Sequence, residues 1–463
     1  SFLEEDEFAT PMQEGKTGVL VLEDGAGALS LRAWLSEQAT ETIDIQYFIY
    51  SADNVGLIST AVLLEAAQRG VKVRILLDDV LAHGDASLLQ VIDQHPNLEV
   101  KIYNPTINVG KTIVEKAHST LNDFEGINHR MHNKSFIVDG QITITGGRNV
   151  GDEYYDFNSH YNFRDRDVAL FGGATQAVQD SFEHFWNSSY SVAISELLEP
   201  ISMKEASDSW NKLRDYSCST KNYILPFRER VNYTPAILEA ELRNNRLVWV
   251  DDVAFYSDAA GKNDVEGLRG GGITTDALIR LVEEAQERIW IQTPYLVLSD
   301  LGLSVFQSAI DRGIEIKILT NSLASTDNYP AFKGYKMVRQ TLLDMGVEVY
   351  EMRPDAPDVI ALNTVGILEK EGAEVGLHSK SLIIDDSIAM IGTFNLDPRS
   401  ANLNTESIVI VRDPTITQNM AQYFHTEMLP ENAWAADQTN DKEAGLKRRI
   451  LTLLSFLVPN ELL

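Results

Sequence analysis

The sequence predicts an α/β protein of two similar lobes, each with a mixed, mostly parallel β-sheet flanked by helices. Three observations lead to this prediction. The chain has 463 residues, more than one hydrophobic core usually supports. Short β-branched segments alternate with amphipathic helical ones, as in strand–helix–strand units. The same series of segments occurs twice, which indicates a duplicated domain.

The two copies of the repeat can be followed element by element. The first begins with the extended segment 42–51, TIDIQYFIYS, and the second with 288–299, RIWIQTPYLVLS. A helical stretch follows in each half and ends at Gly70 or Gly313, and glycine is common just past a helix end. The strands VKVRILL and IEIKILT come next, and then a β-rich segment that ends in Pro, LEVKIYNP or VEVYEMRP.

These segments divide the chain into two lobes and a tail. We expect the first lobe at 15–215, the second at 216–430, and a separate amphipathic tail at 440–463. In the tail, LKRRIL places basic residues before an apolar stretch that Pro459 interrupts. Such a segment is too short to cross a bilayer but suits a membrane interface. A helix docked on the protein's own core is the alternative, and the sequence leaves both open.

Composition restricts the classes of partner. The chain has 39 basic and 68 acidic side chains, which give a formal net charge of −29. Because such a surface repels phosphate backbones at long range, general nucleic-acid binding is disfavoured, although a local basic groove stays possible. Cys218 is the single cysteine, so an internal disulfide is excluded.

Two nearly identical motifs carry the candidate chemistry: HNKSFIVDGQITITGGRN from His132 and HSKSLIIDDSIAMIGTFN from His378. In each motif, a Lys lies two residues after the His, an Asp seven after it and an Asn seventeen after it. Residues two apart on a strand share a face, so each His and Lys should project together from a rigid element. The candidate catalytic residues are therefore His132, Lys134, Asn149, His378, Lys380 and Asn395.

Two acids complete the candidate site. A catalytic histidine needs an acceptor for its second ring nitrogen. Asp165, in FRDRDVAL, and Glu406, in LNTESIVI, precede apolar β-like segments at matching places of the two halves. The aspartates of the motifs, Asp139 and Asp385, end a strand before a turn, and we expect them to be structural.

The duplicated HxKxxxxD signature resembles that of the phospholipase D superfamily, and the resemblance covers nearly the whole chain in order and spacing. The stretches RMHNKSFIVDG, GGRNVGDEYY, ILTNSLAS and NLDPRSANLNTE are similar to bacterial cardiolipin synthases and related phospholipase D-like envelope proteins. The resemblance implies two pseudo-symmetric phospholipase D-type lobes and phosphodiester transfer without a cofactor. It also implies that Asp165 and Glu406 orient the two histidines.

The residue types suit a phosphodiester. A neutral imidazole can attack phosphorus, a protonated one can donate to the leaving alkoxide, and Lys and Asn can stabilise the non-bridging oxygens. By family analogy, His132 is the nucleophile and His378 the acid and base, although two nearly symmetric motifs do not order them. Arg148, Arg166 and Arg399 lie beside motif residues and could contact a lipid phosphate or headgroup. Ion pairs with the abundant acids are the alternative.

The expected function is phosphatidyl transfer of the cardiolipin-synthase type, through a phosphohistidine intermediate, to an alcohol. Phosphatidylglycerol and phosphatidylethanolamine are the expected lipids, and the expected setting is peripheral contact with a bacterial envelope membrane, on its cytoplasmic or periplasmic face. The alternatives are a phospholipase D that forms phosphatidic acid, a nuclease or other phosphodiesterase, and a non-catalytic lipid-binding protein. No metal is expected, because each motif lysine would place a cation beside the ion.

Overall fold

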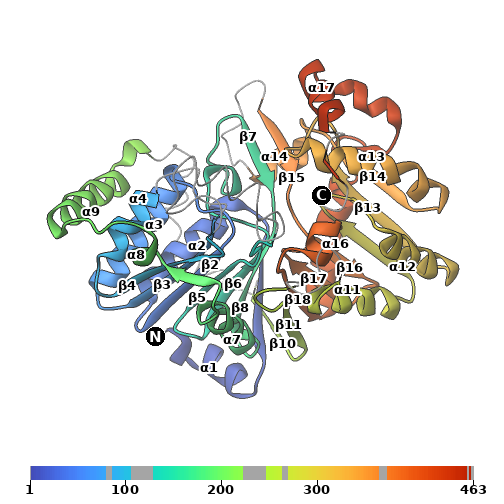
Figure 1. Cartoon of the computed structure of the whole chain (residues 1–463). Helices are drawn as coiled ribbons and strands as arrows, with labels where there is room; N and C mark the ends of the chain where they lie inside the picture. The colour runs from blue at the N-terminus through green and yellow to red at the C-terminus, as the bar shows by residue number, and fades with distance from the viewer. Residues whose placement is uncertain are drawn as a thin grey trace.

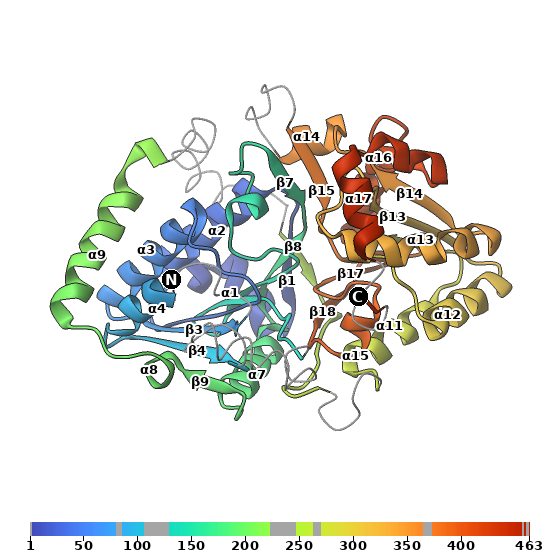
Figure 2. The same ribbon diagram turned by 45° about the horizontal axis from the view of Figure 1, so that its top comes forward.

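The computed structural model describes residues 2–79, 86–105, 129–222, 247–262, 270–363, 373–455, 458–459 and 463. Two lobes lie side by side, the first drawn in blue to green and the second in yellow to red (Figure 1). Each lobe is a β-sheet with helices packed on it, and the same division is visible in the turned view (Figure 2).

The first lobe contains a nine-stranded sheet in the order β10-β1-β8-β6-β5-β2-β3-β4-β9. Neighbouring strands are parallel from β2 to β4 and antiparallel elsewhere. The strands are β1 (Thr17–Leu22), β2 (Thr42–Tyr47), β3 (Lys72–Asp78), β4 (Leu98–Tyr103), β5 (Ser135–Val138), β6 (Ile142–Gly146), β8 (Asp167–Gly172), β9 (Ser191–Ala193) and β10 (Val248–Val250).

The second lobe repeats this topology in an eight-stranded sheet with the order β11-β18-β17-β16-β12-β13-β14-β19. Parallel pairing is again limited to the three strands β12, β13 and β14. The strands are β11 (Val253–Ser257), β12 (Arg288–Gln292), β13 (Glu315–Asn321), β14 (Glu348–Met352), β16 (Ser381–Ile384), β17 (Ile388–Gly392), β18 (Ser407–Arg412) and β19 (Ala433–Ala435).

The predicted α/β class, with two helix-flanked lobes and mixed sheets, is confirmed. The parallel part is smaller than the strand–helix–strand pattern suggested, because the hairpins β5–β6 and β16–β17, which carry the motifs, add antiparallel strands. One strand from the second half of the chain belongs to the sheet of the first lobe. β10 follows residue 216, where the second lobe was expected to begin, yet it pairs with β1 of the first sheet.

Helices cover the sheets, and several begin at a side chain that accepts a backbone N–H. Asp24, Asp53, Ser299 and Asn328 cap α2, α3, α12 and α13 in this way. The helices are η1 (Phe2–Glu4), α1 (Asp6–Gln13), α2 (Gly25–Gln38), α3 (Asn54–Gln68), α4 (Ala86–Asp93), η3 (Asp152–Tyr154), α7 (Thr175–Trp186), α8 (Ile194–Leu197), α9 (Met203–Cys218), η4 (Thr220–Asn222), α11 (Ile273–Glu284), α12 (Asp300–Asp311), α13 (Tyr329–Asp344), α14 (Pro357–Asn363), α15 (Pro398–Asn402), α16 (Pro414–Glu427), η5 (Gln438–Glu443) and α17 (Leu446–Leu454).

Two pairings between the lobes position the candidate site. β7 (Tyr161–Arg164) and β15 (Glu374–Leu377) form a parallel two-stranded sheet between them (Figure 1). β7 leads into Asp165 and β15 into His378, so the end of each strand delivers one candidate residue to the same place. A parallel bridge between Met131 and Thr405 likewise brings together the residues that follow them, His132 and Glu406.

The lobes also share a hydrophobic interface. Val19 and Leu170 of the first sheet belong to one apolar cluster with Ile383 and Val409 of the second, and Phe424 of α16 joins it. Because close-packed apolar surface resists sliding, this interface fixes the relation of the two sheets. Within the described ranges, no helix is long and apolar enough to cross a bilayer.

Candidate active site

The two motifs form equivalent hairpins, and their aspartates anchor the turns. Asp139 and Asp385 adopt left-handed φ values of 50° and 53°, which Asp tolerates. Asp139 Oδ1 accepts the backbone N–H of Thr42 at 2.8 Å, and Asp385 Oδ1 accepts that of Glu287 at 2.8 Å. Both carboxylates thus tie the motif hairpin to the segment that starts the neighbouring strand, which supports a structural role.

Each candidate histidine is hydrogen-bonded to the acid of the opposite lobe. His132 Nδ1 lies 2.8 Å from Glu406 Oε2, and His378 Nδ1 lies 2.5 Å from Asp165 Oδ2. We call these pairs the Glu406 dyad and the Asp165 dyad. All four side chains are buried, and neither lobe can form a dyad alone. The sequence predicted the acids, whereas their exchange between lobes is a finding of the structure.

The motif lysines lie next to the dyads in buried positions. Lys134 Nζ donates to the carbonyl of His132 at 2.8 Å, and Lys380 Nζ donates to that of His378 at 2.5 Å. Burial, together with the charge of Lys380, lowers the pKa of Lys134 to about 7. Burial lowers the pKa of Lys380 to about 8. The effect of Lys380 on Lys134 indicates that the two motifs lie close to each other.

The same forces act on the imidazoles. Burial, with the positive charges of Lys134 and Lys380, holds the pKa of His132 well below its usual range. Burial and Lys380 lower the pKa of His378 to about 4, although Asp165 opposes the change. Both imidazoles are therefore neutral before a substrate binds. With Nδ1–H directed at a carboxylate, Nε2 is the nitrogen left for chemistry.

The two acids differ in charge. Burial opposes ionisation of Asp165, but its contact and hydrogen bond with His378 and the positive charge of Lys380 prevail and hold the pKa of Asp165 below its ordinary value. For Glu406, burial prevails over the attraction of Lys134 and raises the pKa to about 8. The Asp165 dyad thus contains an ionised acid, whereas the Glu406 dyad contains one that readily takes a proton.

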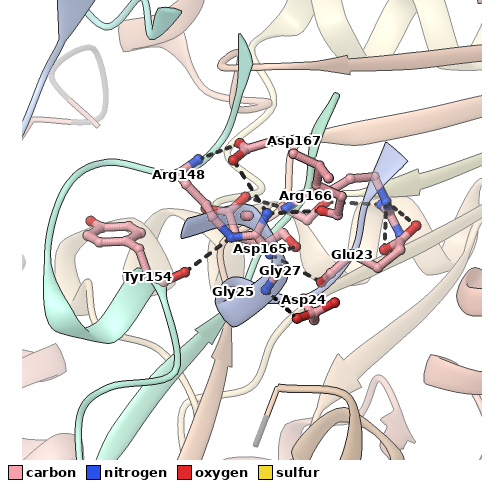
Figure 3. A network of polar contacts seen from close by, with 12 residues as sticks. Glu23, Asp24, Gly25, Gly27, Arg148, Tyr154, Asp165, Arg166 and Asp167 are labelled. Atoms are coloured by element: carbon pink, nitrogen blue, oxygen red, sulfur yellow. Dashed lines mark hydrogen bonds and ion pairs between the residues drawn. The ribbon is translucent and has the colours of Figure 1, made fainter. Parts of the chain in front are cut away.

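Backbone and arginine contacts hold Asp165 firmly, as Figure 3 shows. Its Oδ1 accepts the N–H of Arg166 at 2.8 Å, and its carbonyl accepts from Arg148 at 2.9 Å and from Arg164 at 2.7 Å. A Cβ on Gly147 would lie 2.0 Å from Asp165 Oδ1, so only glycine fits there. The carboxylate is therefore clamped from several sides.

Behind Asp165, five side chains close a ring across the lobe interface. Glu23 accepts from Arg164 at 2.5 Å and from Arg166 at 2.9 Å. Arg164 donates to Glu427 at 2.6 Å, Gln292 donates to Glu427 at 2.6 Å, and Arg166 donates to Gln292 at 2.8 Å. This interlobe ring pairs two carboxylates with two guanidinium groups, so its buried charges balance.

The arginines predicted as possible lipid contacts have different surroundings. The Arg148 and Arg166 side chains are buried and bonded to protein acceptors, Arg166 within the interlobe ring (Figure 3). The ion-pair alternative therefore accounts for both. Arg399 lies 3.5 Å from Asn404 Oδ1, and its charge helps to lower the pKa of His132. The charge of Arg399 thus acts on a candidate catalytic histidine.

The two motif asparagines are not equivalent either. Asn149 Oδ1 accepts the N–H of Ile49 at 3.1 Å, and Asn149 Nδ2 donates to the Tyr154 hydroxyl at 3.0 Å. Both polar ends of Asn149 are thus used by the protein. Asn395 Oδ1 is buried and has no hydrogen-bond partner within the described part of the chain. Asn395 is consequently the amide that remains free for a substrate.

Sequence reasoning missed the aromatic walls and one hydroxyl. The Phe48 ring lies edge-on to the His132 ring, with 5.0 Å between the ring centroids. The centroids of the Phe163 and His378 rings lie 4.8 Å apart. Thr393 Oγ1 donates to Glu406 Oε2. Aligning GGRN with GTFN could have found Thr393, because it occupies the place of Gly147. Among the described residues, no group of His, Cys, Asp and Glu could hold a metal ion.

Comparison with known proteins places this geometry in a family. The family described as "Cardiolipin synthase, PLD-like domain" matches residues 35–186 and 278–428. Cardiolipin synthase C of Escherichia coli (strain K12) is 32% identical over 473 residues, covering 96% of each chain. An uncharacterized protein of Helicobacter pylori is 34% identical over 407 residues, covering 87% of this chain and 78% of that one.

A solved structure shares the fold over the full length. Phosphatidylserine synthase of Haemophilus influenzae Rd KW20 superposes with a TM-score of 0.61 at 13% identity, covering 98% of this chain and 99% of that one. The twofold family match spans both motif hairpins and all four dyad residues. The chain therefore belongs to the cardiolipin synthase PLD-like domain family and is an enzyme of the phospholipase D superfamily.

Proposed function

We propose that this enzyme is a phosphatidyltransferase of the cardiolipin-synthase type. The observation that carries the proposal is the pair of cross-lobe dyads, with a buried lysine beside each histidine. Such a site suits two successive displacements at one phosphorus, since one imidazole can bond to phosphorus while the other moves protons. The similarity to proteins named cardiolipin synthases supports a phospholipid as the substrate.

In the first step, His132 Nε2 attacks the phosphorus of a phospholipid. The bond from phosphorus to the headgroup oxygen breaks, and His378 Nε2 donates a proton to that oxygen as it leaves. The depressed pKa of His132 favours this assignment, because its nitrogen lone pair stays free. His378 takes up this proton from solvent when the substrate binds, because the ionised Asp165 stabilises its imidazolium form and the negative phosphate offsets the charge of Lys380.

In the second step, the hydroxyl of an acceptor, most simply phosphatidylglycerol, attacks the phosphorus. His378 removes its proton, the bond between phosphorus and His132 breaks, and both imidazoles return to the state that they had in the substrate complex, with His378 protonated. Lys134 and Lys380 stabilise the non-bridging oxygens in both transition states. Asn395, with its unengaged carbonyl, accepts from a substrate hydroxyl or ammonium, whereas Asn149 holds the wall of the site.

The chemistry requires no cofactor, and the substrates are membrane lipids. We therefore propose peripheral contact with a bacterial envelope bilayer, on either face. Phosphatidylethanolamine is a second candidate donor, because its headgroup also leaves as an alcohol.

The test is product analysis on vesicles of phosphatidylglycerol mixed with phosphatidylethanolamine. We expect mass spectrometry to find cardiolipin with the wild-type enzyme and none with His132→Ala. Phosphatidic acid as the single product would replace the proposal with hydrolysis, and cleavage of DNA or RNA at low salt without lipid products would replace it with a nuclease. Equal cardiolipin formation by His132→Ala would remove the mechanism altogether.

A further inference from the structure

Helix α17 exposes an unusual amount of apolar surface. Leu446 is 69% exposed, Ile450 47%, Leu453 71% and Leu454 59%. A helix on a globular surface normally turns such side chains toward the core, since leaving them in water costs free energy. Nearly half of the exposed large apolar side chains found in the described part of the chain thus lie on this nine-residue helix.

The side chains are ordered around the helix axis. With a turn of about 100° per residue, the four exposed apolar residues fall on one arc, with Lys447 and Arg449 at its two edges. Both basic side chains are exposed. This order, apolar in the middle and basic on both flanks, is typical of helices that lie in a membrane interface.

The opposite face of α17 is attached to the second lobe. Thr452 is buried, α17 packs against α13, and Arg448 forms an ion pair with Glu374. The two alternatives for the tail, a docked helix and an interfacial segment, are therefore combined in one element. Residues 456–457 and 460–462 of the tail lie outside the described residues.

We propose that the exposed face of α17, formed by Leu446, Ile450, Leu453 and Leu454, is the membrane-docking surface, and that it docks on an anionic phospholipid bilayer. The basic edges of α17 are complementary in charge to an anionic bilayer, which is why we choose this partner. A chain of net charge −29 is repelled by an anionic bilayer in most orientations, so the basic edges of α17 select the orientation that brings the apolar arc to the lipid. This inference deepens the proposed function and rests on it.

Docking through α17 also orients the active site. Glu374, the partner of Arg448, is the first residue of β15, and β15 runs directly into His378. α17 lies beside the two-stranded sheet between the lobes in both views (Figure 1, Figure 2). A membrane bound at α17 is therefore on the side of the molecule where the lobes meet.

Vesicle co-sedimentation of the full chain tests this surface. For vesicles of phosphatidylglycerol and phosphatidylcholine, we expect the double variant Leu446→Ser/Leu453→Ser to lower the partition coefficient roughly tenfold or more. Lys447→Gln/Arg449→Gln should weaken binding to these vesicles, with a smaller effect at high salt. Met203→Ser is the matched control. It removes a 58% exposed apolar side chain from α9, at the other end of the molecule (Figure 1), and should bind as wild type.

Two outcomes overturn the inference. One is unchanged vesicle binding by the Leu446→Ser/Leu453→Ser variant, with its unfolding temperature intact. The other is a changed oligomeric state in sedimentation without changed vesicle binding, which would make a second copy the occupant. Activity on a short-chain phospholipid dissolved as monomers separates this inference from the proposed function. The leucine variant should keep that activity, whereas His132→Ala should bind vesicles normally and form no product.

Discussion

The two halves of the active site have the same backbone and different surroundings. Gly147 N–H donates to the carbonyl of Arg166 at 3.0 Å, and Thr393 N–H donates to that of Ser407 at 3.0 Å. This register makes Gly147 equivalent to Thr393, and Arg166 to Ser407. The acids that precede Arg166 and Ser407, Asp165 and Glu406, are therefore equivalent as well.

Asp165 lies near the positive charges of Lys380 and Arg148. Glu406 lies near Lys134 and Lys262, but the negative charge of Asp258 opposes them, and a hydroxyl donates to Glu406. Arg166 joins the interlobe ring, but Ser407 has no charge to contribute, and the remaining oxygen Oε1 of Glu406 has no hydrogen-bond partner within the described ranges. The same fold thus yields an ionised acid in one dyad and an acid with a raised pKa in the other. A duplicated scaffold with symmetric motifs can in this way give its two histidines different tasks.

The largest expected effects test that division of tasks directly. His132→Ala and His378→Ala should each lower kcat by about 10³-fold or more, because each removes a reacting group. With a phospholipid labelled in its phosphate, His378→Ala enzyme quenched in denaturant at alkaline pH, where a phosphorus–histidine bond survives, should retain label on the peptide containing His132. His132→Ala should retain none, and His160→Ala, at an exposed histidine, should behave as wild type. Label on His378 would reverse the assignment.

Replacing the acid of each dyad tests whether the two dyads contribute differently to catalysis. We expect Asp165→Asn to lower kcat by about 10²- to 10³-fold, because an amide cannot stabilise the imidazolium form of His378. Glu406→Gln should lower kcat only about tenfold, because the raised pKa of Glu406 leaves less negative charge to lose. Steady-state kinetics of both variants measure the difference. An equal decrease of kcat in both variants would mean that the two dyads have the same role in catalysis.

The interlobe ring supports one dyad and not the other. Glu23→Gln leaves the buried guanidinium of Arg166 without its carboxylate partner and Arg164 with Glu427 alone, so the free energy of unfolding should fall by about 3 kcal/mol. The added positive charge should lower the pKa of His378 further, so activity that requires its protonated form should shift to lower pH. Glu183→Gln, in a partly exposed pair with Arg74 that Asp44 also joins, should cost at most about 1 kcal/mol. Lost stability with an unmoved pH profile would limit the ring to a structural role.

Much of this site follows from sequence because its parts are local. Motif spacing predicts that His132 and Lys134 project together, although they lie just before the strand, which begins at Ser135, and not on it. The turn after the strand predicts a structural Asp139. The matching position of Asp165 and Glu406 identifies the acids. Their partners depend on which chain ends meet between the lobes, through β7 with β15 and Met131 with Thr405, and no local pattern encodes such contacts.

Charged side chains show the other limit of sequence reasoning. Arg148 and Arg166 stand beside motif residues, yet both point into the protein, because backbone carbonyls and Glu23 lie behind Asp165 (Figure 3). The sequences GGRN and FRDRD do not indicate in which direction these two arginine side chains point. Glu23 itself, at the end of β1, has no motif around it and is recognised only once the ring closes in three dimensions.

The pH dependence of kcat/KM should distinguish the contributions of Lys134 and Lys380. Lys134 and Lys380 have lowered pKa values of about 7 and about 8, so they carry charge below those values and lose it as pH rises through them. Because an anionic substrate requires that charge, kcat/KM for a monomeric short-chain phospholipid should fall between about pH 7 and pH 9, up to tenfold per unit for each lysine. Lys134→Met should remove the step at lower pH. A kcat/KM that stays constant over this range would contradict the lowered pKa values.

The smallest expected effect concerns Thr393, the residue that replaces Gly147 in the second half. Thr393→Val keeps the shape but removes the hydroxyl that donates to Glu406, so the pKa of Glu406 should rise further and kcat should fall about three- to tenfold, on the order of 1 kcal/mol. Thr393→Ser keeps the donor and should stay near wild type. If Thr393→Val were as active as wild type, the hydroxyl would not tune Glu406. The difference between the dyads would then come from their burial and from the charged groups around them.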